Sequence, residues 1–128
     1  MILVDTSSWI HFLRPDGNAA VRARVERALK DGDACWCPIV SLELWNGAGG
    51  ERERAVLRQF ERVLAALAID EAVWSLARSL AREARRRGIT MPATDLLIAA
   101  CARHHGAELE TADADFDLLE GVRVRGEG

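Results

Sequence analysis

Residues 2–9 read ILVDTSSW, and this segment sets the fold class. Ile2, Leu3 and Val4 form a run without a polar residue, which is typical of a strand covered on both faces of a parallel sheet. Asp5 follows directly, and residues 6–13 predict a turn and a short helix that end at the turn signal RPDG. A carboxylate therefore follows the first predicted strand, at the edge where open α/β sheets bind ligands.

Strand-like and helical segments alternate along the rest of the chain. We expect further strands at residues 34–37, 67–69, 107–111 and 122–125. Helices are predicted over residues 18–30, 39–45, 51–66, from 70 or 71 to about 87, from about 92 to 105, and as a turn at 114–119. The stretch 96–102 is apolar on every side and should be buried. Such alternation predicts a mainly parallel sheet with helices on both faces.

Length and composition narrow the class of protein. With 128 residues, of which 49% are hydrophobic, the chain is expected to form one domain over residues 1–128. Its 17 basic and 20 acidic residues create no global positive field that would attract nucleic acid. It has no apolar run near the roughly 20 residues of a membrane helix and no secretory signal, so a cytoplasmic location is expected. Cys35, Cys37 and Cys101 lack a zinc-ligand spacing and are assigned to the core.

Four acidic residues follow predicted strands or lie in the first turns of predicted helices. They are Asp5, Glu43 in SLEL, Asp95 in TDLL and Asp113 in TAD. In a parallel α/β fold these positions meet at one edge of the sheet. Carboxylates held a few ångströms apart repel one another, so the group must take up protons or bind a cation. Mg²⁺ suits an all-oxygen site of this kind.

Each acid also has a structural explanation. Asp5, Asp113 and Asp115 could cap the helices that follow them, and the helix dipole could stabilise Asp95 without any ligand. Glu43 is the sharper signal, because it shares a helix face with apolar residues, whereas a solvated glutamate should lie opposite them. We prefer Asp113 as the fourth acid of the cluster, with Asp115 as an auxiliary.

In this order and setting the acids resemble those of the PIN-domain ribonucleases, most closely the VapC-type toxins of toxin–antitoxin pairs. The resemblance rests on ILVDTS at 2–7, SLEL at 41–44 followed by Gly47, PATDLLIAA at 92–100 and LETADADF at 109–116. It covers essentially the whole chain. Only the opening segment and residues 94–100 are specific individually, and the others gain weight from their order and spacing.

The resemblance implies a three-layer α/β/α sandwich. In it, Asp5, Glu43, Asp95 and Asp113 would surround Mg²⁺ or Mn²⁺ and catalyse hydrolysis of a phosphodiester in RNA, with Asp115 as a further metal ligand. The role of Glu43 stays open between direct ligation, orientation of water and general base. Thr6, Ser7 and Thr111 match polar family positions that could hydrogen-bond the carboxylates, although capping of adjacent turns explains them equally well.

The resemblance also implies two protein partners. One is a second copy of the chain, in a homodimer, and the other is a small antitoxin whose tail lies in an apolar groove near the acids. Trp9, Phe12, Leu13 and Trp45 are candidates for that groove, although core packing is the more common role of such side chains.

Three other functions fit parts of the pattern. A catalytically silent PIN-like module would bind RNA or protein without turnover, but the intact acids argue against it. A housekeeping PIN nuclease would keep the acids and have no antitoxin. An aspartyl-phosphate phosphatase also begins with an apolar strand and an aspartate, but it needs a second aspartate two residues later, and position 7 is serine.

Overall fold

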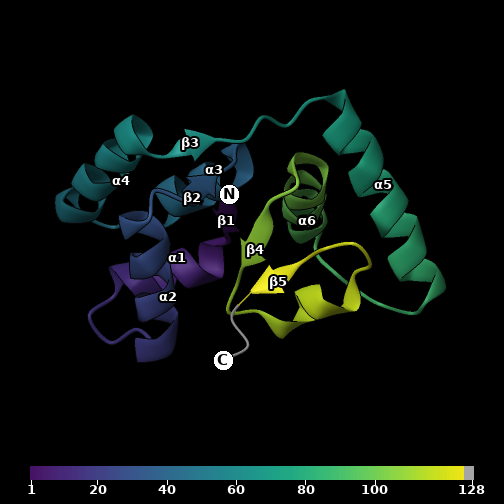
Figure 1. Ribbon diagram of the computed structural model, residues 1–128, viewed down its shortest axis with the longest axis horizontal. Helices are drawn as coiled ribbons and strands as arrows, with labels where there is room; N and C mark the ends of the chain where they lie inside the picture. The colour runs from purple at the N-terminus through teal and green to yellow at the C-terminus, as the bar shows by residue number, and fades with distance from the viewer. Residues whose placement is uncertain (126–128) are drawn as a thin grey trace.

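Five short strands form one parallel sheet in the computed structural model, which describes residues 1–125 (Figure 1). Neighbouring strands in the order β3-β2-β1-β4-β5 are all parallel. The strands are β1 (Ile2–Val4), β2 (Ala34–Trp36), β3 (Ala65–Ala66), β4 (Glu108–Glu110) and β5 (Val124–Arg125). The predicted parallel sheet is confirmed.

Helices cover both faces of this sheet. They are α1 (Thr6–Leu13), α2 (Ala19–Lys30), α3 (Pro38–Gly47), α4 (Glu51–Val63), α5 (Glu71–Arg86), α6 (Ala93–His105) and the 3₁₀ helix η1 (Ala114–Leu118). Figure 1 shows α1, α2 and α4 on one side of the strands and α5 and α6 on the other. The α/β/α sandwich expected from the sequence is therefore confirmed. Within residues 1–125, no helix has the length and apolar character that crossing a bilayer requires.

Capping side chains set the starts of helices α2 and α5. The Oδ1 atoms of Asn18 and Asp70 accept hydrogen bonds at 3.1 Å from the backbone N–H groups of Val21 and Val73, respectively. Helix α6 ends at Gly106, whose φ of 67° is a left-handed conformation that glycine adopts without strain. These three boundaries agree with the sequence prediction.

The third strand lies two residues earlier than predicted. Helix α4 was expected to reach residue 66 and the strand to begin at Leu67, but α4 ends at Val63 and the strand is Ala65–Ala66. Its position follows from pairing with β2, in which Trp36 faces Ala66. The apolar periodicity predicted a longer helix because it reflects only neighbouring residues. The pairing of β3 with β2 joins segments about thirty residues apart, so periodicity does not predict it. The second, fourth and fifth strands are also shorter than predicted.

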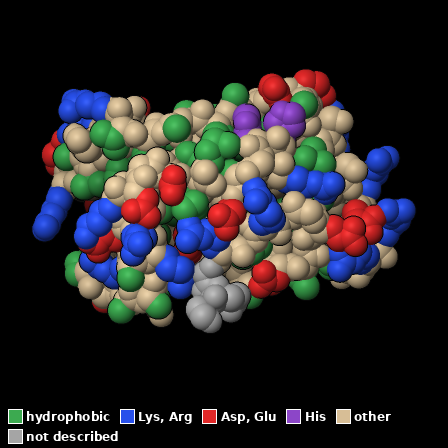
Figure 2. All heavy atoms as spheres, in the orientation of Figure 1, with side chains coloured by type: hydrophobic (Ala, Val, Ile, Leu, Met, Phe, Trp, Pro, Cys, Tyr) green, Lys and Arg blue, Asp and Glu red, His purple; other side chains and the backbone are tan. Residues whose placement is uncertain are grey.

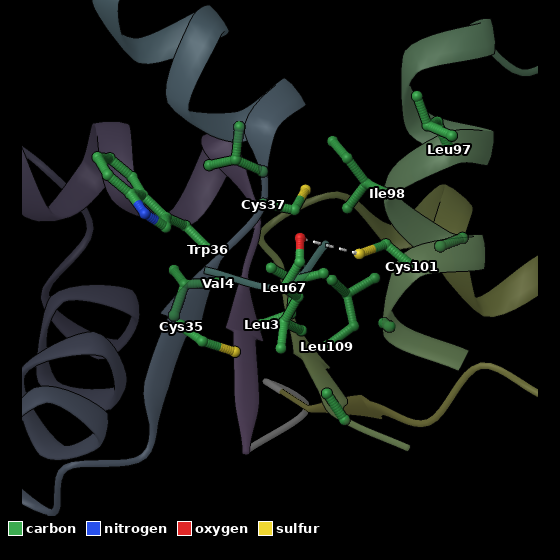
Figure 3. Close-up of a cluster of buried hydrophobic side chains, with 14 of the residues drawn as sticks. Leu3, Val4, Cys35, Trp36, Cys37, Leu67, Leu97, Ile98, Cys101 and Leu109 are labelled. Atoms are coloured by element: carbon green, nitrogen blue, oxygen red, sulfur yellow. Dashed lines mark hydrogen bonds between the residues drawn. The ribbon is translucent and has the colours of Figure 1, made fainter. Parts of the chain in front are cut away.

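The surface and the interior differ sharply in composition. On the face shown in Figure 2, basic and acidic side chains are interspersed, in agreement with a net charge near zero. Inside, every residue of 96–102 is buried, as its apolar sequence predicted. Figure 3 shows Ile98 and Cys101 of α6 facing the strand residue Leu109 in one cluster. All three cysteines are buried free thiols, which confirms their assignment to the core.

Candidate active site

The carboxyl ends of β1 and β4 form the structural base of the site. β1 is the central strand, and the chain runs from it to β2 and β3 on one side and to β4 and β5 on the other. The backbone N–H of Asp5 donates to the carbonyl oxygen of Glu110 at 2.8 Å, so the residues that follow the two strands lie side by side. This is the topological switch point, where open α/β sheets bind their ligands.

Asp5 is buried and held by two hydroxyl groups. Its Oδ2 accepts hydrogen bonds from Ser7 Oγ at 2.8 Å and from Thr111 Oγ1 at 2.9 Å. Asp5 is also the N-cap residue of α1, but its side chain makes no capping hydrogen bond. Capping therefore does not explain this carboxylate, and Ser7 and Thr111 contact it as the resemblance implied.

Glu43 lies on α3, half-buried, with its side chain directed back to the start of α1. Thr6 Oγ1 donates to Glu43 Oε1 at 2.7 Å, which fixes one oxygen of this carboxylate. The hydroxyls of Thr6 and Ser7, neighbours in the sequence, thus orient two different acids. The segment that follows β1 positions both Asp5 and Glu43.

Asp95 lies in the first turn of α6 and faces the other acids. Its pKa is raised from 3.8 to about 6, chiefly by burial and to a smaller extent by the negative charges of Asp5, Asp113, Glu43 and Asp115. Of the four neighbouring charges, that of Asp5 acts most strongly on Asp95. These repulsions are in line with the expected meeting of the acids at one edge of the sheet, and their assignment to a single site stays a prediction.

Asp113 and Asp115 lie on the loop and 3₁₀ helix that follow β4. Asp113 Oδ1 accepts a hydrogen bond from the backbone N–H of Asp115 at 2.9 Å, so Asp113 caps η1 as the structural alternative expected. Asp113 is half-buried and Asp115 is exposed. The preference for Asp113 as the more central acid agrees with this placement.

The charge of this acid cluster is not balanced by the protein. Within residues 1–125, no ion pair involves Asp5, Glu43, Asp95, Asp113 or Asp115. In the same residues, no group of three or more His, Cys, Asp or Glu side chains is placed so that it could hold a metal ion. Unbalanced carboxylates that are close but not in contact fit a hard divalent ion such as Mg²⁺, which binds one or two carboxylates directly and keeps several waters.

Comparison with known proteins assigns the family. The model of the PIN domain family matches residues 2–122. This chain is a PIN-domain protein. Ribonuclease VapC11 of Mycobacterium tuberculosis is 36% identical over 126 residues, which cover 95% of this chain and 93% of the relative. Ribonuclease VapC51 of the same species is 33% identical over 94% of this chain and 85% of its own length.

Solved structures share the fold of this PIN domain. The VapBC complex of Salmonella typhimurium, crystallised bound to DNA, superposes with a TM-score of 0.82 at 24% identity and covers 97% of this chain and 96% of its own. At that identity the likeness concerns the fold. The family resemblance inferred from the four acidic segments is confirmed.

One buried acid of this PIN domain escaped the sequence analysis. Glu110, the last residue of β4, is 1% exposed. Its Oε2 accepts from Ser8 Oγ at 3.0 Å and its Oε1 from Arg24 Nε at 2.9 Å, which ties β4 to both α1 and α2. The only sequence signal was a glutamate in a strand that should be covered on both faces, and its partner Arg24 lies 86 residues away.

An open groove runs beside Glu43 on the α1–α3 side of the PIN domain. Its volume is about 550 Å³, and its apolar walls include Ile10, Leu13 and Leu44. Trp9 does not line it, because its side chain is 0% exposed and packs inside the core. Of the four predicted groove residues, Leu13 lines the groove, whereas Trp9, Phe12 and Trp45 do not. Successive helix residues point about 100° apart, so Trp9 faces the core while Ile10 faces the groove.

Proposed function

We propose that this chain is an endoribonuclease that requires a divalent metal and acts as the toxin of a toxin–antitoxin pair. The observation that carries the proposal is the group of five acids without a cationic partner at the switch point of a PIN fold. Its relatives VapC11 and VapC51 are named ribonucleases, which supports RNA as the substrate.

We assign Asp5, Asp95 and Asp113 to binding of Mg²⁺ or Mn²⁺, with Asp115 as an auxiliary ligand. When bound, such an ion lowers the pKa of a water molecule and neutralises charge on the leaving oxygen of a phosphodiester. Ser7 and Thr111 hold Asp5 in one orientation through their hydrogen bonds to Oδ2.

Glu43 has a different place in this proposal. Thr6 fixes one of its oxygens, and Glu43 is the one of the five proposed site acids that lines the groove. A carboxylate fixed in this way can orient the attacking water or accept its proton. We therefore assign Glu43 to the catalytic group rather than to the primary metal ligands.

Metal binding can be tested without any substrate. A cation that binds only the folded state should stabilise it by about 2.7 kcal/mol at a hundredfold excess over its dissociation constant. We expect Mn²⁺ to raise the melting temperature of the wild type but not that of an Asp5→Asn/Asp113→Asn variant. Asparagine can keep the hydrogen bonds at both positions, because its carbonyl oxygen also accepts. Equal shifts for the two proteins would remove the proposed site.

The proposed partners are RNA, a second copy of the chain in a homodimer, and a cognate antitoxin. The VapBC complex of Salmonella typhimurium supports an antitoxin, and the groove beside Glu43 is the surface on which an apolar segment could dock. A segment bound there would lie next to the acids and could block access to them.

Substitution of Ile10 should separate inhibition from catalysis. Ile10 is 37% exposed in the groove, so Ile10→Lys should preserve the fold and RNA cleavage while placing a charge where an apolar segment docks. We expect cells that express the wild type alone to stop growing. Co-expression of the antitoxin from its neighbouring reading frame should restore growth of cells with the wild type but not of cells with Ile10→Lys. Leu118→Lys is the matched control, because Leu118 is 44% exposed on η1, outside the groove.

Two results would contradict this reading. Full rescue of Ile10→Lys would show that the antitoxin does not use the groove. Harmless expression of active wild-type protein in its own host without a partner would favour a housekeeping PIN nuclease over a toxin.

A further inference from the structure

A second cavity adjoins the acid cluster on the side away from the groove. Its volume is about 400 Å³, within the range of small-molecule sites. Thr111 and Asp113 line it, and Thr111 also donates its hydroxyl to Asp5 Oδ2. A group bound in this cavity therefore touches the same residues that hold the acid cluster.

Arg24 supplies a prearranged pair of donors to this cavity. Its Nε donates to the buried carboxylate of Glu110 at 2.9 Å, and its side chain remains 25% exposed where it lines the cavity wall. Within residues 1–125, the two Nη atoms of Arg24 make no hydrogen bond to the protein. Because Glu110 is itself held by Ser8, the planar guanidinium is oriented before any ligand arrives, which lowers the entropy lost on binding.

His11 and Asn18 add further donors to the same cavity. The backbone N–H of Asn18 donates to His11 Nδ1 at 3.1 Å, so the proton of the neutral ring must lie on Nε2. Asn18 Oδ1 accepts from the backbone of Val21, which leaves the amide NH₂ as the other polar group of that side chain. Hydrogen-bond donors on these residues thus share the cavity with the carboxylates of Asp113 and Asp117.

The charge balance of the cavity selects against a phosphate. Glu110 already neutralises Arg24, and Asp113 and Asp117 add negative charge, so a second anion would be repelled. A neutral group with two adjacent acceptors on one edge and donors on another would pair with the donors of Arg24 and with the carboxylates of Asp113 and Asp117. Among nucleobases, guanine has this pattern, with N7 and O6 as adjacent acceptors that match a guanidinium fork.

We infer that this cavity binds a guanine base of the RNA, beside the phosphodiester that is cut. The placement of the base beside the cut phosphodiester rests on the proposed ribonuclease function. Binding of the base itself does not. Arg24 contacts the N7 and O6 edge, and Asp117 accepts from the N1–H and N2–H₂ edge. Glu110 and Ser8 act as positioning residues, because they reach the base only through Arg24.

Binding is measured first, on metal-free protein, by NMR titration with guanosine, 7-deazaguanosine, adenosine and inorganic phosphate. We expect guanosine to shift resonances of residues around the cavity and to bind about tenfold more tightly than 7-deazaguanosine, which lacks the N7 acceptor. Arg24→Lys keeps a positive charge for Glu110 but loses the fork, so it should abolish this difference. Arg27→Lys, on the exposed side of α2, is the matched control and should behave as the wild type.

Three binding results would overturn the inference: no shifts with guanosine, equal affinity for guanosine and adenosine, or phosphate shifting the same resonances in an Arg24-dependent way. Thermal melts of Arg24→Lys show whether the variant is folded. If that variant is unstable, Asp117→Asn replaces it: Asp117 is exposed at the cavity, and loss of its second acceptor oxygen should weaken guanosine binding, whereas unchanged binding would overturn the inference.

Sequencing of cleaved RNA ends then tests the position of the base. The wild type should show guanine enriched at one fixed position beside the cut, and Arg24→Lys should reduce that enrichment about tenfold while cutting at other sites persists. Guanosine binding without any RNA cleavage would refute the proposed ribonuclease function but not the base-binding site. Cleavage without guanine enrichment or guanosine binding would refute the base site alone.

Discussion

Asp95→Asn should lower the rate of RNA cleavage by roughly two orders of magnitude or more, since even residues that only support a metal ligand typically contribute 10- to 100-fold. The negative charges of the other four acids all act on Asp95, and the proposed function assigns Asp95 to metal binding, so its loss should weaken the site. A fluorescent RNA substrate with Mg²⁺ or Mn²⁺ measures the rate. Asp31→Asn, an exposed acid paired with Arg27 far from the site, should cleave like the wild type.

The same substitution should stabilise the protein when metal is absent. The pKa of Asp95 is raised to about 6 in the folded state, so its ionised form is disfavoured there. Below about pH 4 the carboxyl is protonated in both the folded and the unfolded state, and wild type and Asp95→Asn should be equally stable. Wild-type stability should then fall relative to the variant as pH rises from about 4 to 6. Above that range the difference should stay constant.

Two findings would contradict the assignment of Asp95. Cleavage that proceeds equally well in excess EDTA would exclude a metal-dependent reaction. A marked loss of metal-free stability in Asp95→Asn would mean that the carboxylate chiefly stabilises the first turn of α6.

Trp9→Ala should lower the free energy of unfolding by about 3–5 kcal/mol, the usual range for removal of a large buried aromatic side chain. The Trp9 ring is 0% exposed and packs against Phe60 at a centroid distance of 4.7 Å and edge-on against Phe12 at 6.1 Å. Urea unfolding followed by circular dichroism measures the change. Trp74→Ala is the matched control, because Trp74 is 45% exposed on α5 and its loss should alter stability little.

Trp9→Phe should be much milder than the alanine variant. Within residues 1–125 the buried Nε1 of Trp9 has no hydrogen-bond acceptor, so phenylalanine removes an unsatisfied donor while keeping most of the ring. Unchanged stability of Trp9→Ala would mean that the ring is not part of the core. If Trp9→Ala also abolishes rescue by the proposed antitoxin, the unfolding data decide the cause, since a destabilised protein loses its binding surfaces as well.

Sequence patterns were sufficient where the deciding interactions are local. The cap at Asn18, the end of α6 at Gly106 and the burial of residues 96–102 follow from side chains within one element and its flanks. Convergence of Asp5 and Asp95 could also be predicted, because parallel strands all present their carboxyl ends at one edge of the sheet.

Other features depend on contacts between distant segments. Glu110 looked like an ordinary strand residue until folding placed Arg24 and Ser8 against it. Beside Glu43, the packing of α1 turned Trp9 into the core and left Ile10 at the groove, although both are apolar neighbours in the sequence.

Sequence alone determined the fold class and the order of the acids along it, because hydrophobic periodicity and the alternation of strands and helices are properties that a chain carries along its length. Tertiary structure alone decided the start of β3 at Ala65, the buried pair of Arg24 and Glu110, and which face of α1 is open. Hydrophobic periodicity in the sequence predicts that a side chain is buried. The identity of the group that covers it depends on how elements far apart in the sequence pack together.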